Sequence, residues 1–205
     1  MSSEPYVEDH LDTYLEKNLS LKATLREALT IAIISLYGGL YAGFLLSDLR
    51  DAIVIIPGIL ILIPAILAMR GNISMALGAR LGSAIHMGLI SRIERNPELT
   101  NNIAVSILLS LSLSIFLGVL GYLLTTMLGY TEVSPLSFIF IAVFSGVMSG
   151  LVLSVLTVVI ALAAFRFGMD PDNVTSPLIG TLGEVVTMVF IWAAVKVVIF
   201  WYIIP

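Results

Sequence analysis

The chain has 205 residues, of which 59% are hydrophobic and 12% are charged, whereas soluble domains carry about a quarter charged residues. Together with a mean hydropathy of +1.06, this composition predicts an integral membrane protein. The sequence contains no cysteine, which excludes disulfides and thiolate metal sites, and its net charge of -4 offers no basic footprint for nucleic acid.

The N-terminal residues are polar and acidic. Val7, Leu11 and Tyr14 recur at helical spacing, which predicts a short amphipathic helix lying at the membrane surface. We therefore expect two parts: a cytoplasmic amphipathic segment, residues 1–23, and a five-span transmembrane domain, residues 24–205.

Uncharged stretches mark the membrane spans, because a helix needs about twenty apolar residues to cross the hydrocarbon. The first span is predicted over residues 28–47, and the third, fourth and fifth over residues 103–128, 135–165 and 177–202. Trp201 and Tyr202 at the end of the fifth are typical of the membrane interface. The predicted fold is all-α, with five transmembrane helices.

The second span, residues 52–90, is expected to be broken. It contains Pro57, Gly58 and Pro64, and we place the break at the polar residues 70–72. Backbone groups freed by a break are tolerated only where protein or water satisfies them. Discontinuous helices are a recurring feature of transporter binding sites, so the break is a candidate part of a site.

Glycines in the predicted spans are spaced for close helix packing. Gly78 and Gly82 form one GxxxG spacing, Gly146 and Gly150 form another, and Gly118 is a further packing position. Small residues at this spacing let membrane helices approach closely. They predict contacts between helices and identify no function.

Basic residues indicate the orientation. With a cytoplasmic N-terminus, the outside loops hold only Arg50, whereas the inside segments hold Lys17, Lys22, Arg26, Arg92, Arg95 and Arg166. The positive-inside rule therefore predicts a multi-pass protein of the cell membrane with its N-terminus in the cytoplasm and its C-terminus outside.

Polar chemistry is concentrated in residues 168–184, which read GMDPDNVTSPLIGTLGE. Prolines follow Asp170 and Ser176, and because a residue before proline avoids the helical region, a turn is expected here before a helix starts near Pro177. The stretch is bounded by long uncharged runs. Its acids therefore lie at or inside the edge of a lipid-buried helix.

One face of the fifth span carries a small residue, an acid and a hydroxyl. Gly180, Glu184 and Thr187 fall at i, i+4 and i+7, which places them on the same side of a helix. A charge in hydrocarbon costs several kcal/mol, so an intramembrane acid marks a functional site. We expect this face to line a cation pathway, with Glu184 as its main charged group.

The candidate ligands all offer oxygen. They are Glu184, Asp170, Asn173, Thr181 and, from the second span, Asn72. Hard oxygen ligands suit magnesium, calcium or manganese, and magnesium needs few protein ligands because it keeps several waters. We expect magnesium as the transported substrate, with manganese or calcium as alternatives, and no organic cofactor.

Each candidate residue also has a purely structural interpretation. Asp170 and Asn173 could cap a helix, and Asn72 could satisfy backbone at the break. Glu184 could be a protonated acid hydrogen-bonded to a neighbouring helix. Arg70 and Arg80 are expected to pair with acids or to reach the interface.

Two motifs carry a resemblance to a known family. Residues 64–86, PAILAMRGNISMALGARLGSAIH, resemble one signature of MgtE-type magnesium transporters and of the related solute carrier family 41, and residues 168–184 resemble the second. The motifs occur in the expected order, and the five-span pattern covers nearly the whole chain. The resemblance implies a homodimer with its ion pathway on the two-fold axis, lined by the second and fifth spans of both subunits.

The resemblance also assigns residues to the ion pathway. Glu184 takes the place of the family's central ion-site carboxylate, and Asp170 matches the acid of its DP turn at the cytoplasmic end. Gly180 and Thr181 match positions beside the ion route, and Asn72 matches the asparagine at the helix break.

The chain departs from the family in two respects. The central acid is usually aspartate, so Glu184 could shift the site or change its ion preference. The large cytoplasmic sensor region of bacterial members is not found in this sequence, so gating through that region does not transfer. The chain resembles a single half of the solute carrier branch and is expected to need a partner copy.

Several functions remain open at this point. The leading hypothesis is a divalent-cation transporter or channel, and the first alternative is a sodium- or proton-coupled exchanger that exports the ion. A non-transporting membrane scaffold, with acids used for helix pairing, is a further alternative. No nucleophile and base pair or metal-ligand histidine motif appears, so we do not expect an enzyme.

Overall fold

The computed structural model describes residues 21–90, 96–130, 134–166 and 171–203. All regular structure in these residues is helical, as predicted. The helices are α2 (Leu21–Asp48), α3 (Arg50–Ile55), α4 (Ile59–His86), α5 (Pro97–Met127), α6 (Pro135–Arg166) and α7 (Pro171–Ile203).

Four helical stretches in the described residues are long and apolar enough to cross a membrane. They are Ile59–His86, Pro97–Met127, Pro135–Arg166 and Pro177–Trp201, and α2 contributes a shorter apolar stretch, Ala32–Asp48. The predicted second to fifth spans are therefore confirmed as long apolar helices. The predicted total of five spans therefore depends on α2, the predicted first span, which has only the shorter apolar stretch. The amphipathic helix expected near the N-terminus falls in residues 1–20, outside the described part.

The chain forms two compact units, Met1–Tyr37 and Gly38–Pro205. The described part of the first, residues 21–37, is a stretch of α2 with exposed apolar side chains that include Leu25, Leu29 and Ile33. The second unit holds the end of α2 and all the other helices. The predicted boundary between residues 23 and 24 stays a prediction.

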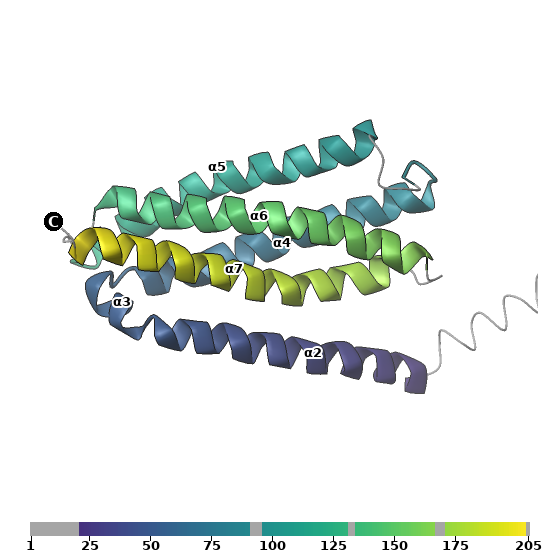
Figure 1. Cartoon of the computed structure of the whole chain (residues 1–205), viewed down its shortest axis with the longest axis horizontal. Helices are drawn as coiled ribbons and strands as arrows, with labels where there is room; N and C mark the ends of the chain where they lie inside the picture. Colours follow the sequence, from purple (N-terminus) through teal and green to yellow (C-terminus); the bar gives the residue numbers. More distant parts are fainter. Residues whose placement is uncertain (1–20, 91–95, 131–133, 167–170, 204–205) are drawn as a thin grey trace, which may run out of the picture. The chain divides into compact units, whose positions relative to one another are not determined.

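Helices α4 to α7 form the bundle of the second unit, and consecutive helices run in opposite directions (Figure 1). Both α4 and α6 pack against the other three helices of the bundle. A core cluster fills the end of the bundle near α3, with Ile59, Phe138 and Ile191 fully buried. A second cluster, around Leu81 and Ala161, fills the other end.

The predicted glycine contacts are confirmed. A Cβ added at Gly118 would lie 2.7 Å from the Ile139 Cα, and one added at Gly146 would lie 3.2 Å from the Ser114 Cβ. A Cβ at Gly78 would lie 3.2 Å from the Thr175 Cγ2. Small residues therefore let α4, α5, α6 and α7 approach closely, as is usual in membrane bundles.

The break in the second span is at Pro57 and Gly58, and its prediction at residues 70–72 was wrong. α4 continues without interruption from Ile59 to His86. Ile56 has φ -128° and ψ 75°, because a residue before proline avoids the helical region. A Cβ at Gly58 would lie 1.9 Å from the Thr125 Oγ1, so only glycine fits this turn. Gly71 costs a helix only about 1 kcal/mol and does not break it.

One predicted helix start was wrong, and another helix begins before its predicted span. α7 begins at Pro171 and carries Pro177 inside it, whereas a start near Pro177 was predicted. α5 begins at Pro97, with the Asn96 side chain accepting a hydrogen bond from the Glu98 N–H at 2.8 Å. Both helices start in polar residues before the apolar run, because proline at the first turn and a capping side chain suffice to begin a helix.

Candidate functional site

Glu184 lies at the N-terminal end of a buried stripe of α7. Met188, Ile191 and Val195 follow it at i+4, i+7 and i+11 and are at most 1% exposed, whereas Glu184 itself is exposed. Neighbouring helices therefore bury this stripe as far as Met188 and leave Glu184 exposed. Among the described residues, the structure records no hydrogen bond or ion pair to the Glu184 carboxylate.

Gly180 and Thr181 have different surroundings one turn earlier. A Cβ added at Gly180 would have nothing within 4 Å, so Gly180 borders open space. Thr181 is 8% exposed and donates a hydrogen bond to the Pro177 carbonyl at 3.2 Å. Its Cγ2 would lie 2.8 Å from a Cβ at Gly38 of α2. Thr181 therefore packs against α2, and Gly180 remains on the open side.

Asn72 lies at the same depth in the bundle as this part of α7. The contact between Gly78 and Thr175 fixes the register of α4 against the antiparallel α7. Six residues back along α4 is Asn72, and six residues forward along α7 is Thr181. The fold therefore brings Asn72, Gly180, Thr181 and Glu184 to one level on two neighbouring helices. Asn72 is exposed, inside a continuous helix and not at a break.

The exposed stripe of α4 is unlike a lipid-facing surface. Pro64, Ala68, Asn72 and Ala76, spaced four residues apart, are all exposed. Exposed positions of α5 and α6 instead carry large apolar side chains, such as Leu108, Phe116 and Val155. Small and polar residues at membrane depth indicate contact with protein or water.

Three other predicted positions have different outcomes. Asp170 lies outside the described residues, and Asn173 lies in α7 but its side chain is not described. Thr187 is fully buried with its hydroxyl unpaired. The expected lining of Gly180, Glu184 and Thr187 is therefore wrong at Thr187, because the edge of the open face passes between Glu184 and Thr187.

Arg70 neither pairs with a described acid nor reaches the interface, although one of these was expected. Its side chain is fully buried between α4, α5 and α6, so it does not reach the interface. It donates hydrogen bonds to the hydroxyls of Ser110 and, at 3.3 Å, of Ser74. No described carboxylate pairs with it. The four-residue spacing of Ser106, Ser110 and Ser114 in α5, all buried, was the sequence signal for this polar seam.

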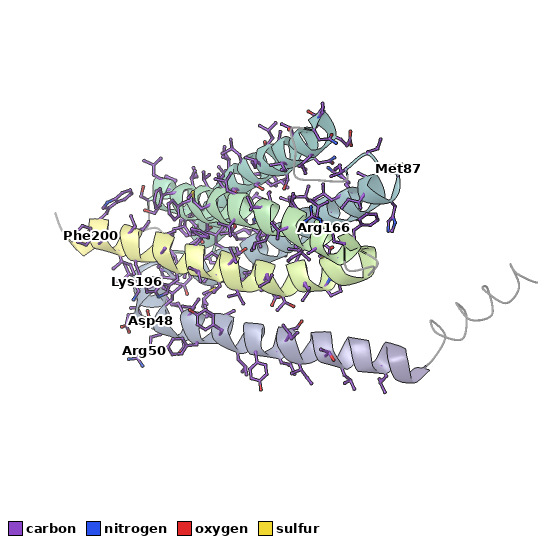
Figure 2. The ribbon with its side chains drawn as sticks, turned by 45° about the vertical axis from the view of Figure 1, so that its right-hand side comes forward. Asp48, Arg50, Met87, Arg166, Lys196 and Phe200 are labelled. Carbon is purple, nitrogen blue, oxygen red and sulfur yellow. The ribbon has the colours of Figure 1, made fainter. Side chains whose placement is uncertain are left out.

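A second polar cluster connects α2 to α7. The Asp48 carboxylate accepts hydrogen bonds from the Lys196 ammonium and the Trp192 indole N–H, both at 2.8 Å. The Lys196 nitrogen also lies 5.5 Å from the centre of the Trp192 ring. Figure 2 shows Asp48 and Lys196 side by side, near Arg50 at the end of the unit. Trp192 and Lys196 are 144 and 148 positions from Asp48, so the sequence gave no local signal for these contacts.

One copy of the chain offers no complete metal cage in its described part. Among those residues, no group of three or more histidine, cysteine, aspartate or glutamate side chains could hold a metal ion. The acids whose side chains are described are Asp48, Asp51, Glu98 and Glu184, and all four are exposed. Asp48, Asp51 and Glu98 lie at or next to helix ends, whereas Glu184 lies inside the apolar stretch Pro177–Trp201. Glu184 is therefore the single acid with a described side chain on the open face.

Comparison with known proteins gives consistent matches. A model of the MgtE divalent cation transporter family matches residues 63–194. Solute carrier family 41 member 3 of Rattus norvegicus is 27% identical over 177 residues, which cover 82% of this chain and 37% of that protein. Solute carrier family 41 member 2 of Gallus gallus is 26% identical over 161 residues, covering 74% of this chain and 27% of that protein.

The chain spans well under half the length of these curated relatives. No solved structure matches it significantly. The family match covers α5 and α6 completely, together with most of α4 and α7, which are the two helices that carry the open face. The chain is a multi-pass membrane protein that belongs to the MgtE family of divalent cation transporters.

Proposed function

We propose that this protein carries a hydrated divalent cation, magnesium first, across the cell membrane. The observation that carries the proposal is the exposure of Glu184 inside the apolar stretch Pro177–Trp201, next to a stripe that is buried from Met188 onward. An acid facing lipid there would cost several kcal/mol. Water, an ion or a second protein surface must therefore cover it.

A second copy of the chain is the cover that we propose. In a two-fold dimer the open faces of α4 and α7 meet their symmetry mates, and two Glu184 carboxylates approach a shared pathway. The small residues Ala68 and Ala76 allow close helix contact, while Asn72 contributes an amide. This arrangement supplies two carboxylates where one subunit supplies one.

Magnesium suits such a sparse site. It dehydrates reluctantly and is usually bound by one or two carboxylates and several waters. Glu184 and Asn72 would contact the hydrated ion in the pore, and Gly180 leaves room for its water shell. With a cytoplasmic N-terminus, Asp170, which precedes α7 in the sequence, and Asn173 in the first turn of α7 would form the cytoplasmic mouth.

The test is ion flux into vesicles that contain only the purified protein. Magnesium, manganese and calcium are supplied in turn, with and without opposing sodium and proton gradients. Uptake of magnesium without any opposing gradient is the expected result. Uptake that requires a sodium or proton gradient would instead assign coupled exchange. A protein that assembles but neither binds nor carries a divalent ion would be a scaffold, and the proposal would be wrong.

A further inference from the structure

The buried guanidinium of Arg70 has a site built for it. A Cβ added at Gly150 of α6 would lie 3.2 Å from the Arg70 Nη1 and 3.3 Å from its Cζ. The hydroxyls of Ser110 and Ser74 accept hydrogen bonds from the guanidinium, whose Nε has no partner in the described residues. A glycine and two serines thus make space for the side chain but leave its charge uncompensated.

An unpaired charge inside a membrane bundle is costly. Charged side chains within membrane spans are rare and usually face a partner or a pathway, and an uncompensated buried charge destabilises a fold strongly. The four carboxylates whose side chains are described are all exposed, and none of them pairs with Arg70. Hydrogen bonds to serine hydroxyls alone do not neutralise the guanidinium, so its presence in the bundle needs another explanation.

Arg70 lies at the depth of Glu184. Arg70 precedes Gly78 by eight residues, and Gly183 follows Thr175 by eight residues. Since Gly78 and Thr175 are in contact on antiparallel helices, Arg70 and Glu184 lie at nearly the same level of adjacent α4 and α7. Asp48 and Asp51 lie at the α3 end of the bundle, and Glu98 lies at the start of α5.

The two opposite charges are near each other but not in contact. Arg70 points toward α5 and α6, whereas Glu184 is on the open face of α7. Packed helix axes are about 8 to 10 Å apart, which puts the two groups on the order of 10 to 15 Å from each other. At such a distance and an effective dielectric constant of about 20, each unit of charge on an ion at Glu184 changes its binding constant about tenfold.

We propose that Arg70 is a fixed buried counter-charge that weakens the binding of a divalent cation at Glu184. This inference rests on the proposed function, because it presupposes a cation at Glu184. The repulsion acts twice on a divalent ion and once on a monovalent one. Passage through a pore requires an ion to bind well enough to enter and weakly enough to leave. Arg70 is thus a positioning residue that sets affinity and does not touch the ion.

The experiment measures manganese binding at equilibrium and magnesium flux in proteoliposomes for Arg70→Met. Binding about ten- to a hundredfold tighter is expected, together with a lower maximal flux. Arg70→Lys keeps the charge and should bind as the wild type does. Arg80→Met is the matched control, because Arg80 is exposed and lies about 15 Å further along α4; it should change neither quantity.

A second variant neutralises the charge while the arginine stays in place. Ser74→Asp puts a carboxylate where the Ser74 hydroxyl now accepts a hydrogen bond from Arg70 at 3.3 Å. It should tighten binding as Arg70→Met does, even if Arg70→Met fails to assemble. A merely structural role would lower the melting temperature of Arg70→Met without tightening binding.

The outcomes separate the two proposals. Wild-type affinity, or weaker binding, in assembled Arg70→Met and Ser74→Asp would overturn the counter-charge. If flux in the same vesicles still disappears in Glu184→Gln, the proposed function survives that result. A wild-type protein that neither binds manganese nor carries magnesium would remove both proposals together.

Discussion

Single side chains determine how closely the helices of the bundle approach. Gly118 of α5 packs directly on the backbone of α6, because an added Cβ would lie 2.7 Å from the Ile139 Cα, an atom that cannot rotate away. Buried serines, such as Ser110 and Ser149, donate to carbonyls one turn earlier in their own helices. Such hydroxyls satisfy themselves locally and leave small surfaces for packing.

We predict that Gly118→Ala destabilises the protein by about 1 to 3 kcal/mol, because overpacking forces backbone shifts. Gly43→Ala is the matched control, since a Cβ there has nothing within 4 Å; it should be neutral or slightly stabilising. Thermal unfolding of both variants in detergent measures the difference. Equal melting temperatures for the two would show that the α5 and α6 contact is not as close as described.

The sequence predicted some residue-level features and missed others. Glycine spacing identified Gly146 and Gly150 as packing positions because helical periodicity is local. The burial of Arg70 was missed, since it depends on Ser110 and Gly150, residues 40 and 80 positions away. The exposed face of α7 was predicted from the acid Glu184 in an apolar run. The burial of Thr187 was missed because it depends on how α7 packs against its neighbours.

Among the elements, α3 and the turn after it determine where α4 begins. Pro57 and Gly58 end the short helix and start the long one, and Gly58 packs directly on Thr125 of α5. The end of α2 is held beside α7 by Asp48 and Lys196 and by the burial of Leu49. This contact ties α2 to the helix that bears Glu184.

We predict that Lys196→Met increases amide hydrogen exchange in α3, because the tie between Asp48 and α7 is lost. The effect should be local, since the Lys196 and Asp48 side chains are 45% and 49% exposed and such pairs contribute little to global stability. Arg50→Gln is the control, because its ion pair with Asp51 is 3.6 Å long and more exposed. Unchanged exchange in Lys196→Met would show that Leu49 and its neighbours hold α2 alone.

Element boundaries followed the sequence only where the signal was local. α6 begins at Pro135 as predicted and ends at Arg166, one residue beyond its predicted end. The polar first turns of α5 and α7 were missed, because hydropathy detects the lipid-crossing part of a helix and not its extension into water. The break at Pro57 was misplaced because Arg70 and Asn72, polar residues in an apolar run, were taken to interrupt the helix.

In the whole molecule, the proposed ion pathway needs a second copy of the chain. The open face of α4 and α7 carries small residues and one acid, and a single subunit leaves it uncovered. The surfaces of α5 and α6 carry large apolar side chains that suit lipid, among them Leu108 and Phe116. The two kinds of surface predict which face meets the partner.

We predict that Ala68→Cys forms disulfide-linked dimers in membranes under mild oxidation, because Ala68 lies on the open face. The chain has no cysteine of its own, so a single introduced thiol reports one position. Leu108→Cys on the lipid-facing side of α5 should stay monomeric on a non-reducing gel. Cross-linking at Leu108 but not at Ala68 would place the dimer interface on α5 and would contradict the proposed interface on the open face.

The most direct test of the central claim is magnesium flux through Glu184→Gln in proteoliposomes. The variant keeps the size and hydrogen-bonding capacity of the side chain and removes its charge, and Glu98→Gln makes the same change at an exposed acid at the start of α5. The account predicts that Glu184→Gln assembles normally and loses flux at least about a hundredfold, the scale of one lost charge contact, while Glu98→Gln retains it. Wild-type flux through assembled Glu184→Gln would contradict the account.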